Sequence, residues 1–82
     1  MSIQSIIPSY VTTDLVLAAT LRIYDIVLDN MTMVDKKRAV FYFNNVPDDL
    51  LMKFDTQQLS VEPIAFHNAV VALSTAIKRL KE

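Results

Sequence analysis

The chain has 82 residues and a formal net charge of −1, from eight Lys and Arg against nine Asp and Glu. A domain of this size buries only about 60–65% of the surface that its unfolded chain exposes, so its core is small. The near-zero net charge excludes a global electrostatic field that would attract nucleic acid or an anionic membrane. The absence of cysteine excludes disulfides, thiolate zinc sites and cysteine nucleophiles.

Hydrophobic residues make up 52% of the chain and the mean hydropathy is +0.31. Ordinary domains reach about 45–50% only when glycine is counted as apolar, and this chain contains no glycine. The excess favours an oligomer or a subunit docked on another protein. No apolar run approaches the roughly twenty residues of a membrane-spanning helix, and the N-terminal stretch lacks the features of a signal peptide. We therefore expect a cytoplasmic protein that does not bind membranes.

Residues 1–9 are expected to form an N-terminal arm ahead of a single α+β domain over residues 10–82. Pro8 forbids a helix interior in this segment. The arm offers three apolar side chains for packing, Ile3, Ile6 and Ile7. Because termini are ordered only when something ties them down, the arm is predicted either to fray or to dock on a neighbouring surface.

The first helix is expected from about Asp14 to Tyr24. The two threonines before it can cap its free amides, and Asp14 suits the first turn. Inside the helix only Thr20 and Arg22 are clearly polar. A helix that is apolar nearly all round is a buried helix.

A β-hairpin is expected next, pairing residues 27–34 with 38–44 around a charged turn. Its second strand contains the stretch AVFYF, residues 39–43, which places apolar side chains on both faces because successive residues of a strand point to opposite sides. One face carries Phe41 and Phe43, and the other carries Val40 and Tyr42. Helices can readily cover only one of these faces, so the sequence predicts that another copy or another protein covers the second.

Two further helices complete the expected order of helix, strand, strand, helix, helix. Pro47 and the two aspartates after it have the composition of a first helical turn. The last helix should run from Pro63 to about Lys81. Its large side chains recur every three or four residues, at Phe66, Val70, Leu73, Ile77 and Leu80. A second row at the same spacing is small, at Ala65, Ala69, Ala72 and Ala76.

Three stretches carry a resemblance to a known family: YVTTDLVLAATL (10–21), RAVFYF (38–43) and VEPIAFHNAVVAL (61–73). In this order they resemble a small family of bacteria and their phages that is described only as a domain of unknown function. The resemblance implies a phage or mobile-element setting, in the host-cell cytoplasm or in a virion, and it supplies no activity. Where the family pattern has a glycine after the first helix, this chain has Asp25, which we expect to take the left-handed cap position.

The sequence predicts no catalytic, cofactor or metal site. His67 is the only histidine, and it has no second histidine or cysteine at a metal-binding spacing. Asp48 and Asp49 are adjacent carboxylates, but their place after a proline is better explained by the helix dipole. The lack of glycine also excludes the usual phosphate-binding loops. We expect neither enzymatic activity nor a small-molecule substrate.

Two basic clusters remain. The hairpin turn contains Lys36, Lys37 and Arg38, which could contact phosphates. The last helical turn contains Lys78, Arg79 and Lys81, and cations there stabilise a helix C-terminus.

The sequence favours a noncatalytic module that self-associates or docks on a protein partner. We expect the interface to include Ile3, Ile6, Ile7, Val40 and Tyr42, with the sheet continued across two copies. The competing function is a nucleic-acid-binding regulator that uses Lys36, Lys37 and Arg38. A role as a virion component, an accessory factor or an inhibitor of host defence stays open.

Overall fold

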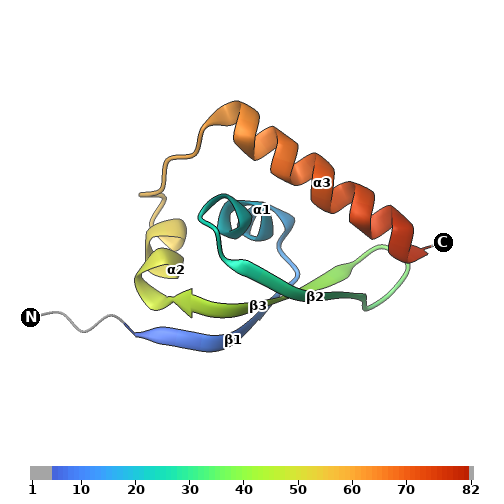
Figure 1. Ribbon diagram of the computed structural model, residues 1–82, viewed down its shortest axis with the longest axis horizontal. Helices are drawn as coiled ribbons and strands as arrows, with labels where there is room; N and C mark the ends of the chain where they lie inside the picture. Colours follow the sequence, from blue (N-terminus) through green and yellow to red (C-terminus); the bar gives the residue numbers. More distant parts are fainter. Residues whose placement is uncertain (1–4, 82) are drawn as a thin grey trace, which may run out of the picture.

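The computed structural model describes residues 5–81. In chain order its elements are strand β1 (Ile6–Thr12), helix α1 (Leu15–Ile23), strands β2 (Val27–Met33) and β3 (Ala39–Pro47), and helices α2 (Asp48–Asp55) and α3 (Pro63–Lys81). The strands form one antiparallel sheet in the order β1-β3-β2, so the AVFYF strand is the central one (Figure 1). The α+β class and the hairpin are confirmed. The expected element order is wrong because it omits β1.

β1 pairs with β3 along its whole length, from Ile6 opposite Pro47 to Thr12 opposite Phe41. Residues 6–9, which we expected in an arm, therefore belong to the sheet. Pro8 is compatible with this strand because β1 lies at the edge of the sheet, where a missing N–H is tolerated. Of the expected arm, Ile3 lies outside the described residues.

All three helices lie on one side of the sheet, and α1 lies between the sheet and α3 (Figure 1). This position explains why five consecutive residues of α1 are buried, namely Leu17, Ala18, Ala19, Thr20 and Leu21. The only polar member, Thr20, donates its hydroxyl to the carbonyl oxygen of Val16 at 2.8 Å. Its burial therefore leaves no polar group without a partner.

Asp14 is the N-cap of α1 and not a residue of its first turn. Its Oδ1 accepts hydrogen bonds from the amides of Val16 at 2.9 Å and Leu17 at 3.2 Å. Thr12 supports it, because its hydroxyl oxygen accepts from the amide of Asp14 at 3.1 Å. Two of the free amides at the helix start are thus satisfied by one carboxylate.

The C-terminus of α1 confirms the left-handed position predicted for Asp25, whose φ is 63°. The amide of Ile26 donates to the carbonyl oxygen of Leu21 at 3.0 Å, and the amide of Asp25 donates to that of Arg22 at 3.1 Å. These two bonds form a Schellman motif, which usually needs glycine at the left-handed residue. Here aspartate fills that position.

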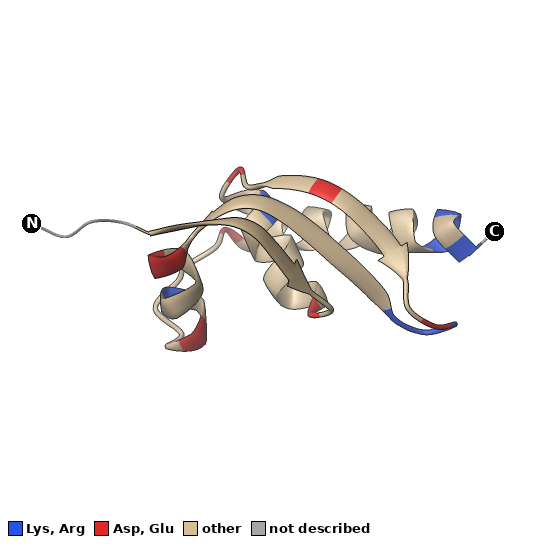
Figure 2. Ribbon diagram, turned by 90° about the horizontal axis from the view of Figure 1, so that it is seen from below, with Lys and Arg blue, Asp and Glu red and all other residues tan. Residues whose placement is uncertain are grey.

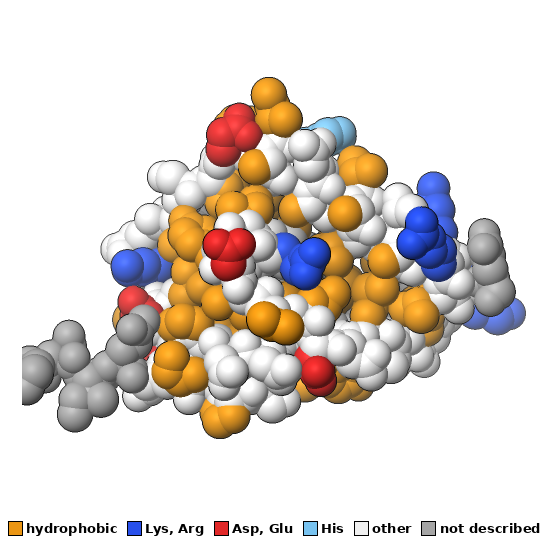
Figure 3. Space-filling model, in the orientation of Figure 1, with side chains coloured by type: hydrophobic (Ala, Val, Ile, Leu, Met, Phe, Trp, Pro, Cys, Tyr) orange, Lys and Arg blue, Asp and Glu red, His pale blue; other side chains and the backbone are white. Residues whose placement is uncertain are grey.

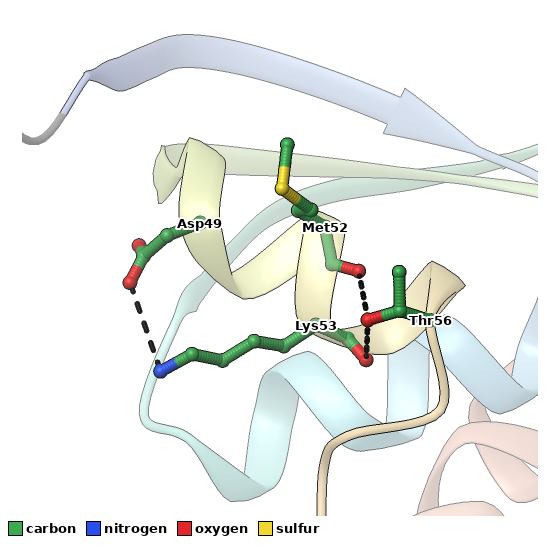
Figure 4. Close-up of polar contacts among 4 residues, drawn as sticks. All are labelled: Asp49, Met52, Lys53 and Thr56. Carbon is green, nitrogen blue, oxygen red and sulfur yellow. Dashed lines mark hydrogen bonds and ion pairs between the residues drawn. The ribbon is translucent and has the colours of Figure 1, made fainter.

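α2 ends in the same way, with Gln57 at a φ of 59°. The amide of Gln58 donates to the carbonyl oxygen of Lys53 at 2.8 Å. The Thr56 hydroxyl reinforces this end by donating to the carbonyl oxygens of Met52 at 2.9 Å and Lys53 at 3.4 Å (Figure 4). A glycine-free chain thus closes two helices with polar residues in the left-handed region.

The core lies between the sheet and the helices. Its buried members are Leu17, Ala18, Ala19, Leu21, Ala39, Phe41, Phe43, Val46 and Leu73. Phe41 and Phe43 are 1% and 0% exposed, as expected for the covered face of β3. From α3, Leu73 is buried and most of its predicted apolar row packs against the core partly buried. Leu80, the last residue of that row, is exposed.

The alanine row of α3 faces an open groove of about 390 Å³ on the β2 side of the molecule. The groove is lined by Arg22, Ile23, Leu28, Ala65, Ala69, Ala72, Leu73 and Ala76. Figure 3 shows hydrophobic side chains exposed between the sheet and α3 in this view. The small side chains therefore leave space beside α3 that no described residue fills.

Candidate functional site

The face of the sheet opposite the helices is the outer face. Residues paired across an antiparallel sheet share a face, which assigns to it Ile6, Ser9, Val11, Val27, Asn30, Thr32, Val40, Tyr42, Asn44 and Pro47. Figure 2 looks onto this face, and α1 and α3 lie behind the strands. Within residues 5–81, no helix covers it.

The outer face carries apolar side chains on all three strands, together with neutral polar ones at Ser9, Asn30, Thr32 and Asn44. Val40, on the central strand, is only 9% exposed although it lies outside the core cluster. Tyr42 is half-buried and lies opposite Val11 on β1. On the outer strands, Val11 is 51% and Val27 is 61% exposed. The outer side chains of the central strand are thus less exposed than the flanking valines.

The predicted interface residues divide between the two faces. Ile6, Val40 and Tyr42 lie on the outer face. Ile7 pairs with Val46 on the inner face and packs partly buried against the core, so it cannot belong to an outer surface. Ile3 lies outside the described part of the chain.

The sequence did not predict that Val11 and Val27 lie on the outer face, and the reason differs between the two residues. Val11 belongs to β1, which the sequence did not reveal as a strand. Simple alternation along β2 would place Val27 on the same face as Met31, but the register shifts between Leu28 and Asn30, so that Asp29 is an extra residue in β2. A β-bulge of this kind reverses the parity of the residues beyond it. The sequence feature that indicates this bulge is the polar pair Asp29-Asn30 inside an otherwise largely apolar strand.

The edges of the sheet do not favour the continuation that the sequence suggested. β3 is paired on both sides and has no free edge. β1 carries Pro8 near its middle, and β2 carries the bulge at Asp29. The Asn30 side chain also accepts a hydrogen bond from the amide of Met31 at 2.8 Å. Prolines and bulges are the features that discourage the addition of a further strand, so contact between copies is expected across the face.

The two basic clusters lie together at one end of the molecule, which we call the basic end. It comprises Lys36, Lys37 and Arg38 of the hairpin turn and Lys78, Arg79 and Lys81 of the last turn of α3. A shallow depression of about 560 Å³ joins the two, lined by Met33, Asp35, Lys36, Leu80 and Lys81. Figure 2 shows both blue segments at the same end, with acidic residues of α2 at the other.

Asp35 shapes the hairpin turn. Its Oδ1 accepts hydrogen bonds from the amides of Lys37 at 2.8 Å and Arg38 at 2.9 Å. The bond from Lys37 lowers the pKa of the Asp35 carboxyl against a smaller opposing effect of desolvation, and the amide and charge of Arg38 lower it further. The carboxylate is thus engaged by the turn's own backbone, while the three basic side chains remain exposed.

The residues considered for catalysis or metal binding lie on two different helices and form no common site. His67 is exposed on α3, and Asp48 and Asp49 lie in the first turn of α2. Asp49 forms an ion pair with Lys53 at 3.9 Å (Figure 4). No group of three or more potential metal-ligating side chains occurs among residues 5–81. Over the same range, none of the helices has the length and apolar character needed to cross a bilayer.

Comparisons with known protein families, with curated proteins and with solved structures find no match to this chain. The resemblance described from the sequence therefore stays a prediction, and the candidate site stands on its own geometry.

Proposed function

We propose that the protein is a noncatalytic module that associates with a second copy of itself through the outer face of the sheet. The observation that carries the proposal is the exposure of Ile6, Val11 and Val27, at 51%, 51% and 61%, on the side of the sheet that no described helix covers. Each square ångström of apolar surface removed from water contributes about 25 cal/mol, so covering this face with another apolar face is favourable.

A second copy suits this surface because none of the ten paired residues that define the outer face is charged, and the acidic residue inserted between them, Asp29, lies at the bulge of the edge strand β2. In a twofold dimer the same patch of both copies is in contact, so a charged residue near the twofold axis would lie close to the same charge of the other copy and be repelled by it. A face whose paired residues are apolar or neutral polar avoids that repulsion away from the bulge. Two such sheets can pack face to face at a separation of about 10 Å.

The size of the face predicts the strength of the association. The longest strand has nine residues, and three strands spaced about 4.8 Å apart with a rise of about 3.3 Å per residue give a footprint on the order of 400 Å². Stable interfaces bury about 800 Å² on each partner. We therefore expect a dimer that forms and dissociates with concentration rather than a permanent one.

The decisive experiment is light scattering across a concentration series with a matched pair of variants. Val11 on the outer face and Val71 on α3 are similarly exposed, at 51% and 48%. Val11→Asp should abolish the concentration-dependent rise in mass because it places like charges opposite one another, whereas Val71→Asp should leave it unchanged. A wild-type protein that stays monomeric throughout, or equal loss of association in both variants, contradicts the proposal.

The proposal assigns no reaction to the protein. A phage or mobile-element setting, with a virion, accessory or anti-defence role, rests on the sequence resemblance alone and is proposed only on that basis.

A further inference from the structure

The basic end gathers most of the positive charge of the molecule in one place. Three cations of the hairpin turn and three of the last turn of α3 account for six of the eight Lys and Arg in the chain. The sequence alone does not show that the two clusters are close in space, because the turn lies near the middle of the chain and the helix end lies near its C-terminus. The fold brings the two clusters to one end of the molecule, where Lys36 from the turn and Lys81 from α3 line the same shallow depression.

The described part of the protein neutralises few of these six charges, and only Arg38 has an electrostatic interaction with a carboxylate, that of Asp35. None of them forms an ion pair with another residue in the range 5–81. Asp35 is the one acidic residue described among them, and its carboxylate, which accepts hydrogen bonds from the turn amides, offsets one of the six positive charges. The dipole of α3 needs only about half an elementary charge at its C-terminus. Most of the local positive charge is therefore available to an external anion.

We infer that the basic end binds the phosphate backbone of double-stranded nucleic acid. Cations from two elements on two sides of a depression suit a repeating line of phosphates better than a single small anion. The acidic residues of α2 lie at the opposite end of the molecule (Figure 2). Their repulsion from the same polyanion orients the protein end-on, with the basic end toward the phosphates.

The surroundings of the basic end favour a duplex over a single strand. Proteins that bind single strands combine positive charge with aromatic side chains on which bases stack. No aromatic residue lines the depression, and Tyr42 lies on the outer face opposite Asn30, away from the turn. Contacts limited to phosphates carry no direct sequence information. We therefore expect binding that does not depend on base sequence.

A membrane surface fits the basic end less well. Peripheral helices bind anionic bilayers by laying an apolar face along the interface. α3 meets the basic end with its last turn and not along its length (Figure 1). The helix thus offers no lateral apolar face to a surface docked at this end.

The test is fluorescence anisotropy with two short DNA duplexes of unrelated sequence, measured over a series of salt concentrations. We expect similar affinities for both duplexes. The logarithm of the binding constant should fall with the logarithm of salt concentration with a slope of up to about −5 if all six cations engage phosphates.

Paired variants locate the contact. Lys36→Gln with Lys37→Gln, and Lys78→Gln with Lys81→Gln, should each reduce the steepness of the salt dependence by about two, because each lost phosphate contact removes about one. The matched control is Arg22→Gln with Lys53→Gln, which changes net charge equally on α1 and α2 and should leave the slope unchanged. Circular dichroism verifies that all three double variants fold.

Several results would overturn the inference. These are the absence of duplex binding at low salt, an equal loss of slope in the control, or tighter binding to a single strand of the same length. Binding to vesicles containing phosphatidylserine but not to DNA would assign the basic end to a lipid surface instead. Because none of these variants touches the outer face, the outcome is independent of whether the protein dimerises.

Discussion

The two faces of β3 differ in how their side chains are covered. Phe43, on the inner face, is completely buried by helices of the same chain, whereas its neighbour Tyr42, on the outer face, is half-buried among side chains of adjacent strands. Both are aromatic and both belong to the central strand. The comparison shows that the exposure of an apolar residue on a strand depends on which layers the rest of the chain supplies.

The largest expected effect on stability comes from a substitution on the inner face of β3. Phe43→Ala removes a fully buried aromatic side chain and should lower the free energy of unfolding by about 3–5 kcal/mol, through lost burial and the cavity left behind. Equilibrium unfolding in urea measures this. Small domains have about 5–15 kcal/mol of stability in total. A measurable fraction of the Phe43→Ala protein should therefore be unfolded even before denaturant is added if the total stability is near the lower limit.

Tyr42→Ala is the matched change on the outer face. It leaves the core intact and removes a cross-strand contact with Val11, a type of contact that contributes about 0.2–1 kcal/mol. The unfolding midpoint should therefore shift much less than for Phe43→Ala. Equal destabilisation by the two changes would mean that the outer face is as important to folding as the inner one.

A smaller effect concerns the helix that covers the inner face. Asp14→Ala removes the N-cap of α1 and should cost about 1 kcal/mol of stability, within a range of about 0.5–2 kcal/mol. Asp14→Asn keeps an oxygen that can accept from the amides of Val16 and Leu17, so it should retain most of the stability. Thermal unfolding of both variants checks this, and equal losses would argue against a capping role.

The smallest effect concerns the turn that joins β2 to β3. Because the folded-state pKa of Asp35 is lowered, its carboxylate supports the turn at and above the ordinary pKa of aspartate, and this support is lost as the pH falls through the lowered value. Amide chemical shifts of Lys37 and Arg38 should follow that titration by NMR. An inflection at or above the ordinary aspartate pKa would contradict the hydrogen-bonded turn.

Local patterns in the sequence were sufficient to predict the hairpin and the three helices. The alternation in AVFYF separated Phe41 and Phe43 from Val40 and Tyr42, and Pro63 marked the first residue of α3. These features depend on interactions between residues close in sequence, such as turns, caps and strand periodicity.

β1 could not be predicted in the same way. Its inward-facing residues, Ile7 and Tyr10, are separated by two exposed residues, Pro8 and Ser9, so the period of two is interrupted. Its partner β3 is also distant in the sequence. The basic end was hidden for a similar reason, since its two clusters meet only because α3 runs back toward the hairpin turn.

The strand order has a consequence for the sequence of folding events. β1 is made first but pairs with β3, while β2 and β3 are joined by a short turn. Local hairpins form within microseconds, whereas distant pairings must first close a long loop. We therefore expect the hairpin to form early and β1 to join it late. Because the outer face takes Ile6 and Val11 from β1, we expect that surface to be complete only when folding has finished.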